Sequence, residues 1–244
     1  QWNNANVKKD LSKWFRPADI LMGTDGALYI ADWYDAVVGG HRIQDQKAHG
    51  RIYRVTPKNR NLKSPKLTLN TQKDLLECFK NPAIHVKYQA YLKLKENSVA
   101  NFTSVIKLLQ DPNPFIKSRA IWLLASMESK GETMVKEILK KGNEKQKVVA
   151  LRALRQNLGS EDLFGLLQNL LNDPSPFVRR EAIQALQSYP FEKTKVLLKK
   201  YADKNPAGDL FYTNAIALVL FGHENDFYNE NIAWFQKHFD LAFA

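Results

Sequence analysis

The sequence lacks the short motifs that mark the common enzyme active sites. It has no glycine-rich phosphate loop, no HExxH zinc motif and no GxSxG serine-hydrolase motif, so nucleotide hydrolysis, zinc proteolysis and serine hydrolysis have no support in these residues. A CxxCH haem-attachment motif is also missing. The classes that remain are binding proteins, structural proteins and pieces of larger enzymes.

Cysteine is almost absent, since Cys78 is the single example in 244 residues. One cysteine excludes internal disulfides and thiolate zinc sites. Cys78 stands in the segment LLECFK, on the apolar side of an expected helix. This position predicts a buried structural thiol rather than a reactive one.

Long apolar runs are missing as well. No run reaches the length of about eighteen apolar residues that a membrane-spanning helix needs, and the most apolar segment, Ala215–Phe221, belongs to an amphipathic pattern. We therefore expect no membrane insertion by this chain. The first residues lack a starting Met and the charged, apolar and small-residue order of a signal peptide, so we expect a piece of a longer protein.

Acidic residues are outnumbered by basic ones: 25 Asp and Glu face 36 Lys and Arg, and the net charge is +11. A basic field attracts anionic partners such as nucleic acid or acidic proteins. The cations are dispersed along the chain, and few aromatic residues stand among them. The favoured interpretation is therefore a solvated, Lys-rich helix surface without a nucleic-acid partner, and a basic nucleic-acid-binding module is the alternative.

What the sequence does contain is an internal repeat. An Ala followed by an apolar residue recurs in a helix-period pattern, at spacings of 30, 30, 32 and 33 residues. The five positions are Ala90, Ala120, Ala150, Ala182 and Ala215. The residues four positions before and after these alanines are apolar, which predicts one apolar face per helix. Phe211 is one of these apolar residues, and Gln146 is the exception. We expect each of these alanines to be buried where adjacent helices approach closely.

Turn chemistry precedes most of these helices. Asx-Pro pairs at 81–82, 111–112, 173–174 and 205–206, and Gly142-Asn143 in the third repeat, can cap the free amides of a helix start. A partner helix is expected before each turn. These partner helices are Thr71–Lys80, Phe102–Gln110, Thr133–Lys140, Glu161–Leu171 and Lys193–Tyr201.

These residues resemble the HEAT repeat family, and DPNPFIKSRAIWLLA and DPSPFVRREAIQALQ are similar to its consensus. The resemblance implies a mainly α fold, a HEAT-type solenoid of about five helix pairs over residues 71–244, with residues 61–70 as a linker. It also implies a ladder of hydrogen bonds between neighbouring repeats, formed by the Asp of each turn and a basic residue six positions later. Asp173 with Arg179 fits the ladder, and Lys141 with Lys147 is predicted to break it.

In HEAT pairs the second helix usually lines the concave side, so its polar and aromatic residues are candidates for binding a protein partner or other domains of the parent chain. The candidates are Lys95, Arg119, Trp122, Arg152, Arg155, Arg180 and Gln184. For the basic residues of the ladder, such as Arg179, a structural role is favoured over ligand contact. For Trp122 a packing role between repeats is favoured over an anchor role.

Residues 1–60 change from helical periodicity to the alternation that is typical of strands. Strands are expected at Ala18–Met22, Ala27–Trp33 and 50–55, with Asp25-Gly26 in a hairpin turn. We expect a small antiparallel sheet that packs on the first helix pair. The side chains expected to make that contact are Leu28, Ile30, Ile52 and Val55.

The string FRPADILMGTDGALYIADWYDAVVGGHRIQDQKAHGRIYRVTPKN resembles the last part of a β-propeller in bacterial membrane-bound dehydrogenases. Those proteins are related to soluble quinoprotein glucose and sorbosone dehydrogenases, and HEAT repeats directly follow their propeller. The resemblance implies a non-catalytic scaffold fragment of a sugar or alcohol dehydrogenase with an extracytoplasmic, periplasmic or membrane-associated location. The parent oxidoreductase would use pyrroloquinoline quinone and haem c, whereas this fragment is expected to hold no cofactor.

The loop after the second strand carries the candidates for a substrate or cofactor rim in the intact propeller. They are Asp32, Trp33, Tyr34, Asp35, His41 and Arg42. With Asp45 and His49, the same loop offers carboxylates and imidazoles for a divalent cation. An ordinary turn-rich loop is the favoured interpretation, so no metal site is predicted and no catalytic residue is assigned.

Overall fold

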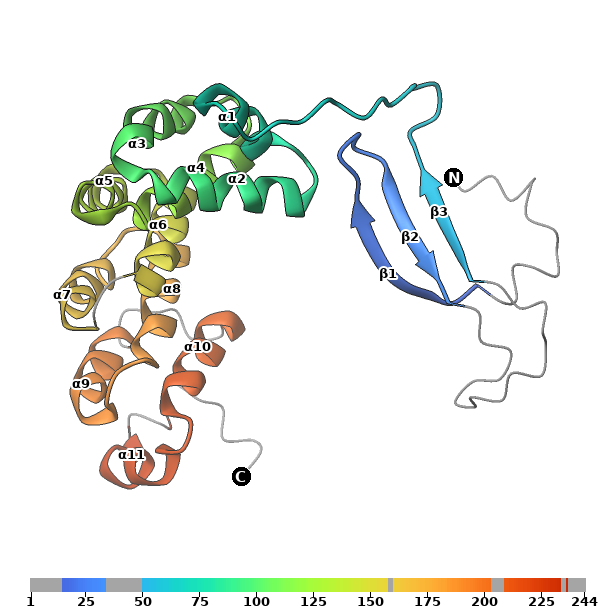
Figure 1. Ribbon diagram of the computed structural model, residues 1–244. Coiled ribbons are helices and arrows are strands. Elements are labelled where there is room, and N and C mark those ends of the chain that lie inside the picture. Colours follow the sequence, from blue (N-terminus) through green and yellow to red (C-terminus); the bar gives the residue numbers. More distant parts are fainter. Residues whose placement is uncertain (1–14, 34–49, 158–159, 203–208, 234–235, 237–244) are drawn as a thin grey trace. The chain divides into compact units, whose positions relative to one another are not determined.

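The computed structural model describes residues 15–33, 50–157, 160–202, 209–233 and 236 (Figure 1). The chain divides into two compact units, residues 1–97 and residues 98–244. The first unit contains a small sheet and one helix pair, and the second contains only helices.

The sheet of the first unit is antiparallel, with the strand order β1-β2-β3. Its strands are β1 (Pro17–Met22), β2 (Leu28–Asp32) and β3 (Arg51–Val55), within two residues of the predicted bounds at each end. In the β1–β2 turn, the Gly26 N–H donates to the Gly23 carbonyl at 3.0 Å, and Gly26 has a φ of 82°. A positive φ favours glycine, which explains why the Asp-Gly pair identified this hairpin from sequence.

The four side chains expected to contact the first helix pair do not share one face of the sheet. Leu28 and Ile30 of β2 share one face with Val55 of β3, whereas Ile52 lies on the opposite face and is 77% exposed. Ile52 and Val55 are three residues apart, and an odd separation places two side chains on different faces of a strand. The prediction that Ile52 covers the first helix pair is therefore wrong.

The helix pair of the first unit consists of α1 (Gln72–Lys80) and α2 (Ile84–Glu96). A capping box begins α1: Thr71 Oγ1 accepts from the Asp74 N–H, and the Asp74 carboxylate accepts from the Thr71 N–H. Hydrogen bonds from Thr68 and Thr71 hold the pKa of Asp74 below its usual value. Cys78 is 1% exposed, so the prediction of a buried thiol is confirmed.

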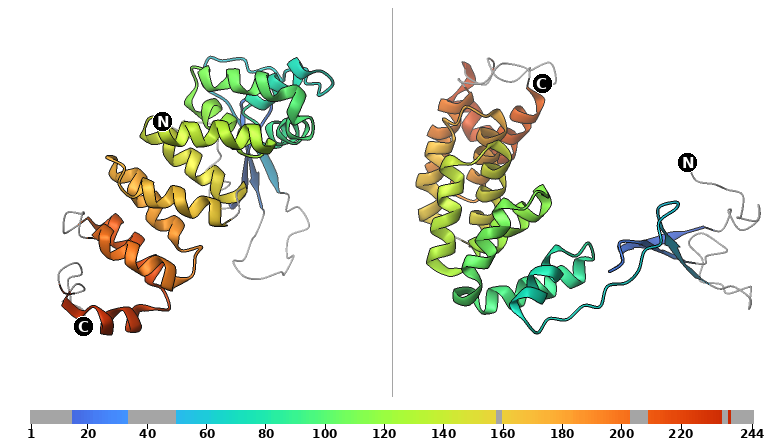
Figure 2. Two further views of the ribbon diagram at one scale, coloured as in Figure 1. Left: turned by 90° about the vertical axis from the view of Figure 1, so that its left-hand side faces the viewer. Right: turned by 90° about the horizontal axis from the view of Figure 1, so that it is seen from above.

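The second unit consists of four helix pairs and a short final helix among its described residues. The bounds are α3 (Ser98–Lys107), α4 (Pro114–Ala125), α5 (Glu128–Lys141), α6 (Glu144–Asn157), α7 (Ser160–Leu170), α8 (Pro176–Leu186), α9 (Phe191–Ala202), α10 (Leu210–Leu220) and α11 (Glu224–Glu230). Each odd-numbered helix from α3 to α9 packs on the helix that follows it, and α4, α6, α8 and α10 also pack on one another in series (Figure 2). Together with α1 and α2, this gives the predicted number of pairs in a HEAT-type solenoid.

The five repeat alanines are all 0% exposed, which confirms that these positions are buried. The register of the last repeat is nevertheless wrong by one residue. Ala182 is the seventh residue of α8, and the seventh residue of α10 is Ile216, not Ala215. In consequence Tyr212 is buried at 2% exposure, whereas Phe211, which was expected on the apolar face, is 69% exposed.

Two first helices of the pairs begin earlier than predicted. The sequence analysis placed the start of α3 at Phe102 and that of α5 at Thr133, whereas the helices begin at Ser98 and Glu128. Gly131 explains the second error, because a glycine near a helix start indicates a break when only the sequence is seen. In the fold, Gly131 lies so close to the Leu124 carbonyl oxygen that an added Cβ would clash with it.

Candidate functional site

The second helices α4, α6, α8 and α10 form the candidate surface of the second unit. They carry six of the seven predicted binding residues. These are Arg119 and Trp122 on α4, Arg152 and Arg155 on α6, and Arg180 and Gln184 on α8. Lys95, the seventh, is exposed on α2 in the first unit.

Arg152 and Arg155 point to the next repeat, where both contact Glu181 of α8. Arg152 donates through Nε and Nη2 to the two carboxylate oxygens of Glu181, at 2.9 and 2.7 Å. Arg155 Nη1 lies 3.9 Å from Glu181 Oε1. The Glu181 side chain is 7% exposed and the Arg152 side chain 55%, so the anion is the buried member of the pair. The hydrogen bond to Glu181 raises the pKa of Arg152.

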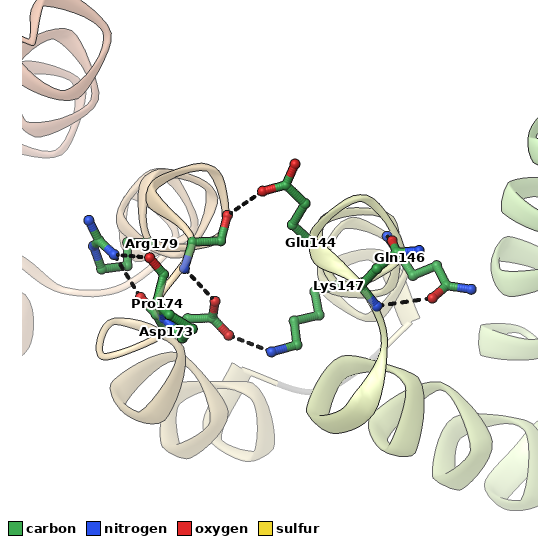
Figure 3. Close-up of polar contacts among 8 residues, drawn as sticks. Glu144, Gln146, Lys147, Asp173, Pro174 and Arg179 are labelled. Atoms are coloured by element: carbon green, nitrogen blue, oxygen red, sulfur yellow. Dashed lines mark hydrogen bonds and ion pairs between the residues drawn. The ribbon is translucent and has the colours of Figure 1, made fainter.

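A second link between the same two repeats lies at the turn before α8 (Figure 3). Lys147 Nζ donates to Asp173 Oδ2 at 2.7 Å, and the other carboxylate oxygen of Asp173 accepts from the Ser175 N–H at 2.9 Å. Ser175 Oγ in turn lies 3.0 Å from Glu144 Oε2. These contacts tie the start of α6 to the start of α8.

The predicted ladder is present, but its partners differ from the prediction. Arg179 Nη1 donates to the backbone carbonyls of Asp173 and Pro174, and the Asp173 carboxylate binds Lys147 of the preceding repeat. The predicted break at Lys141 and Lys147 is therefore wrong for Lys147, which joins the ladder. Lys141, at the ladder's acidic position, instead pairs with Glu137 on its own helix at 2.7 Å.

Arg119 and Trp122 are both partly buried on α4. Burial lowers the pKa of the Arg119 guanidinium. Partial burial of a Trp on a packed helix agrees with the packing role favoured from sequence. Of the predicted binding residues in this unit, the arginines of α6 are thus committed to contacts between repeats.

Sequence reasoning missed a set of exposed aromatic residues at the starts of the second helices. The second residue is Phe115 in α4, Lys145 in α6, Phe177 in α8 and Phe211 in α10. The three phenylalanines are 71%, 51% and 69% exposed. The repeated Pro-Phe of DPNPF and DPSPF was the available signal, because Pro is favoured at the first helical position and so places the following Phe in the first turn of the helix.

Arg180 lies between two of these aromatic rings. Its guanidinium carbon is 5.3 Å from the ring centroid of Phe177, one helical turn earlier, and 5.4 Å from that of Phe211 in the next repeat. Both distances suit cation–π contacts. In the part of the chain that the structure describes, Arg180 has no carboxylate partner.

The predicted rim in the N-terminal unit is only partly visible. Asp32 is 7% exposed, and its Oδ1 accepts from the Arg16 N–H at 2.7 Å, so this carboxylate closes the open end of the β1–β2 hairpin. Trp33 is 66% exposed. Tyr34, Asp35, His41 and Arg42 lie outside the described residues, as do Asp45 and His49. Among the residues described, no group of three or more His, Cys, Asp or Glu could hold a metal ion.

Comparison with known families gives two matches. Residues 131–218 match the family model described as HEAT repeats, and residues 8–59 match a Domain of unknown function (DUF7133). No curated protein matches the sequence. The HEAT match spans most of α5 to α10 and supports the assignment of these three helix pairs as HEAT repeats. Within the described residues, no helix has the length and apolar character needed to cross a membrane.

Proposed function

We propose that this chain is a non-catalytic scaffold segment of a larger, quinoprotein-like sugar or alcohol dehydrogenase. In this proposal the HEAT repeats bind a protein partner or position other domains of the same protein. HEAT repeats are suited to protein binding because stacked helix pairs present one continuous surface along many residues.

One observation carries the scaffold part of the proposal. Helix α6 uses Lys147, Arg152 and Arg155 to hold its repeat to the next one, while phenylalanines at the starts of α4, α8 and α10 stay exposed. Exposed aromatic side chains at regular positions are typical of protein-binding surfaces. A nucleic-acid module would need those cations for phosphate contacts, and here they bind carboxylates.

The N-terminal sheet supports the propeller part of the proposal. Ile20 is 58% exposed on one face and Ile52 is 77% exposed on the other. In the order β1-β2-β3 each outer strand has one edge without a partner among the described strands. A small sheet with apolar side chains on both faces suits a blade packed between other blades.

The remaining parts of the proposal rest on the resemblance of residues 15–59. Pyrroloquinoline quinone and haem c would belong to the parent protein, and its location would be extracytoplasmic. Asp32 and Trp33 would stand near the rim of the propeller. The match to a domain of unknown function covers the same residues and names no activity.

Two experiments test this proposal. The chain incubated with Ca²⁺ and pyrroloquinoline quinone should not reduce a redox dye with glucose or another sugar, whereas a soluble quinoprotein glucose dehydrogenase serves as the positive control. Catalytic dye reduction by this chain would contradict the non-catalytic assignment. The encoding reading frame should continue upstream of Gln1 into further four-stranded blades, and a frame that begins at this residue would contradict the propeller assignment.

A further inference from the structure

We propose that the starts of α4, α6, α8 and α10 form a docking ridge for an extended, acidic segment of a partner protein that carries aromatic or large aliphatic side chains. The docking ridge consists of Phe115, Lys145, Phe177, Arg180 and Phe211. This inference rests on the proposed scaffold function, and it adds the surface and the chemistry of the partner.

Equivalent positions in successive repeats build the ridge. Phe115, Lys145, Phe177 and Phe211 are each the second residue of a second helix, and these helices pack on one another in series. Their side chains therefore follow one another along the stack. The apolar members are more than half exposed, although a single exposed Phe would be unremarkable in a protein of this size. Their recurrence at one position of the repeat is what indicates a surface.

Arg180 gives the ridge a preorganised cation. The rings of Phe177 and Phe211 flank its guanidinium at 5.3 and 5.4 Å, which restricts the side chain without using its hydrogen-bond donors on a carboxylate. An Arg held between aromatic faces can bind a carboxylate through two parallel hydrogen bonds. The adjacent rings can contact an apolar side chain of the same ligand.

Charge complementarity selects an acidic ligand. Lys145 is exposed and, among the residues described, has no ion-pair partner. The ladder cation Lys147, two residues later, binds Asp173. Neither Glu144 nor Asp209 forms an ion pair with these two cations: Glu144 accepts from Ser175, and Asp209 accepts from the N–H groups of Phe211 and Tyr212 as a helix cap. The ridge thus alternates apolar rings with cations that have no carboxylate partner.

The spacing of the repeats sets the length of the ligand. Packed helices lie about 8–10 Å apart, and an extended chain advances about 3.3 Å per residue, so one repeat corresponds to about three ligand residues. Three steps separate α4 from α10, which corresponds to about nine residues. Apolar ligand residues about three positions apart would contact Phe177 and Phe211, with acidic residues between them near Arg180.

The test uses the intact chain and fluorescent peptides of about ten residues. The probe carries Trp or Leu at every third position and Asp or Glu elsewhere, and the control peptides replace the acids by Lys or gather the apolar residues at one end. Fluorescence polarisation should show saturable binding of the probe, at least about tenfold tighter than that of either control. Equal binding of the Lys peptide, or no saturable binding of the probe, would overturn the proposal.

Single substitutions test whether the probe peptide binds at the docking ridge. Phe177→Ser, Phe211→Ser and Arg180→Gln should each weaken the probe at least about tenfold. Val196→Ser is the matched control, because Val196 is 68% exposed on α9 and outside the ridge. Circular dichroism melting should be nearly unchanged in all four variants, since exposed side chains add little to stability. A loss of binding that Val196→Ser shares, or that none of the ridge variants shows, would overturn the proposal.

Other occupants of the ridge give different results. If the chain binds anionic lipid vesicles or duplex DNA more tightly than the probe peptide, and Arg180→Gln abolishes that binding, the ligand of the ridge is a membrane or a nucleic acid and not a peptide. Self-association that Phe177→Ser abolishes would identify a second copy of this chain as the occupant. Loss of probe binding in Gln184→Ala with binding kept in Phe177→Ser would contradict the docking ridge but not the scaffold function. Catalytic dye reduction by the chain would contradict the proposed function itself.

Discussion

The pair formed by Arg152 and Glu181 should be worth measurably more than a surface ion pair, and its two members should respond unequally to removal. Arg152→Met leaves the Glu181 carboxylate, at 7% exposure, with Arg155 at 3.9 Å as its remaining cation. Glu181→Gln leaves Arg152, at 55% exposure, with water to solvate it. Removing the exposed cation should therefore destabilise the fold more than neutralising the buried anion.

The magnitude follows from where this pair lies between two limits. Exposed ion pairs contribute about 0–1 kcal/mol, and breaking a fully buried pair costs about 3–5 kcal/mol. With one buried and one half-exposed partner, we expect about 2–3 kcal/mol for Arg152→Met and about 1–2 kcal/mol for Glu181→Gln. The coupling between the two substitutions should be about 1–2 kcal/mol.

Urea denaturation of the wild type, both single variants and the double variant measures these values in one double-mutant cycle. Lys136→Met is a matched control, because Lys136 pairs with Glu132 on the surface of a single helix and should change stability by less than about 0.5 kcal/mol. A coupling below about 0.3 kcal/mol, or a larger loss for Glu181→Gln than for Arg152→Met, would refute the reasoning.

Three further predictions concern the packing of the fold. Ala150→Glu should lower the free energy of unfolding by several kcal/mol in urea titrations, because Ala150 is 0% exposed; a change below about 1 kcal/mol would contradict the register. Gly131→Ala should destabilise by about 1–3 kcal/mol although Ala favours helices, because its Cβ would meet the Leu124 carbonyl; a higher melting temperature would contradict that contact. Burial raises the pKa of the Cys78 thiol, so a disulfide reagent should label it slowly at pH 8 and rapidly in urea, and equal rates would contradict its burial.

The repeat architecture could be predicted from sequence because helical periodicity and turn chemistry agree along the chain. Alanines at 0% exposure in every repeat show that small residues mark the close helix contacts. The one-residue error in α10 has a local cause. Ala215 and Ile216 are both buried, so the pattern of apolar residues fits two registers, and the Asp209 cap decides between them.

The partners of the ladder could not be predicted, because they depend on distances between repeats. Spacing within one repeat pointed to Asp173 with Arg179, whereas the carboxylate binds Lys147 of the repeat before. The same limit applies to Arg152 and Arg155, which looked like ligand contacts until Glu181 was placed opposite them. A charge on a helix face shows its function only when the neighbouring helix is known.

The docking ridge was missed for a different reason. The binding residues predicted from sequence flank the apolar stripe of each helix, whereas the exposed phenylalanines lie in the first turn, next to the caps. Phe211 was assigned to the core because of the register error in α10. The rim residues Tyr34, Asp35, His41 and Arg42 lie outside the described residues, so their part in the parent protein stays a prediction.

The most direct test of the account measures binding of duplex DNA by this chain across a range of salt concentrations. Lys147, Arg152 and Arg155 join neighbouring repeats, and we propose that the repeats serve as a protein scaffold, so the net charge of +11 should give only weak, non-specific binding. We predict that this binding disappears near physiological salt, where surface charges are screened over about 8 Å. Submicromolar binding that persists at physiological salt, and that Arg152→Met weakens, would contradict the account.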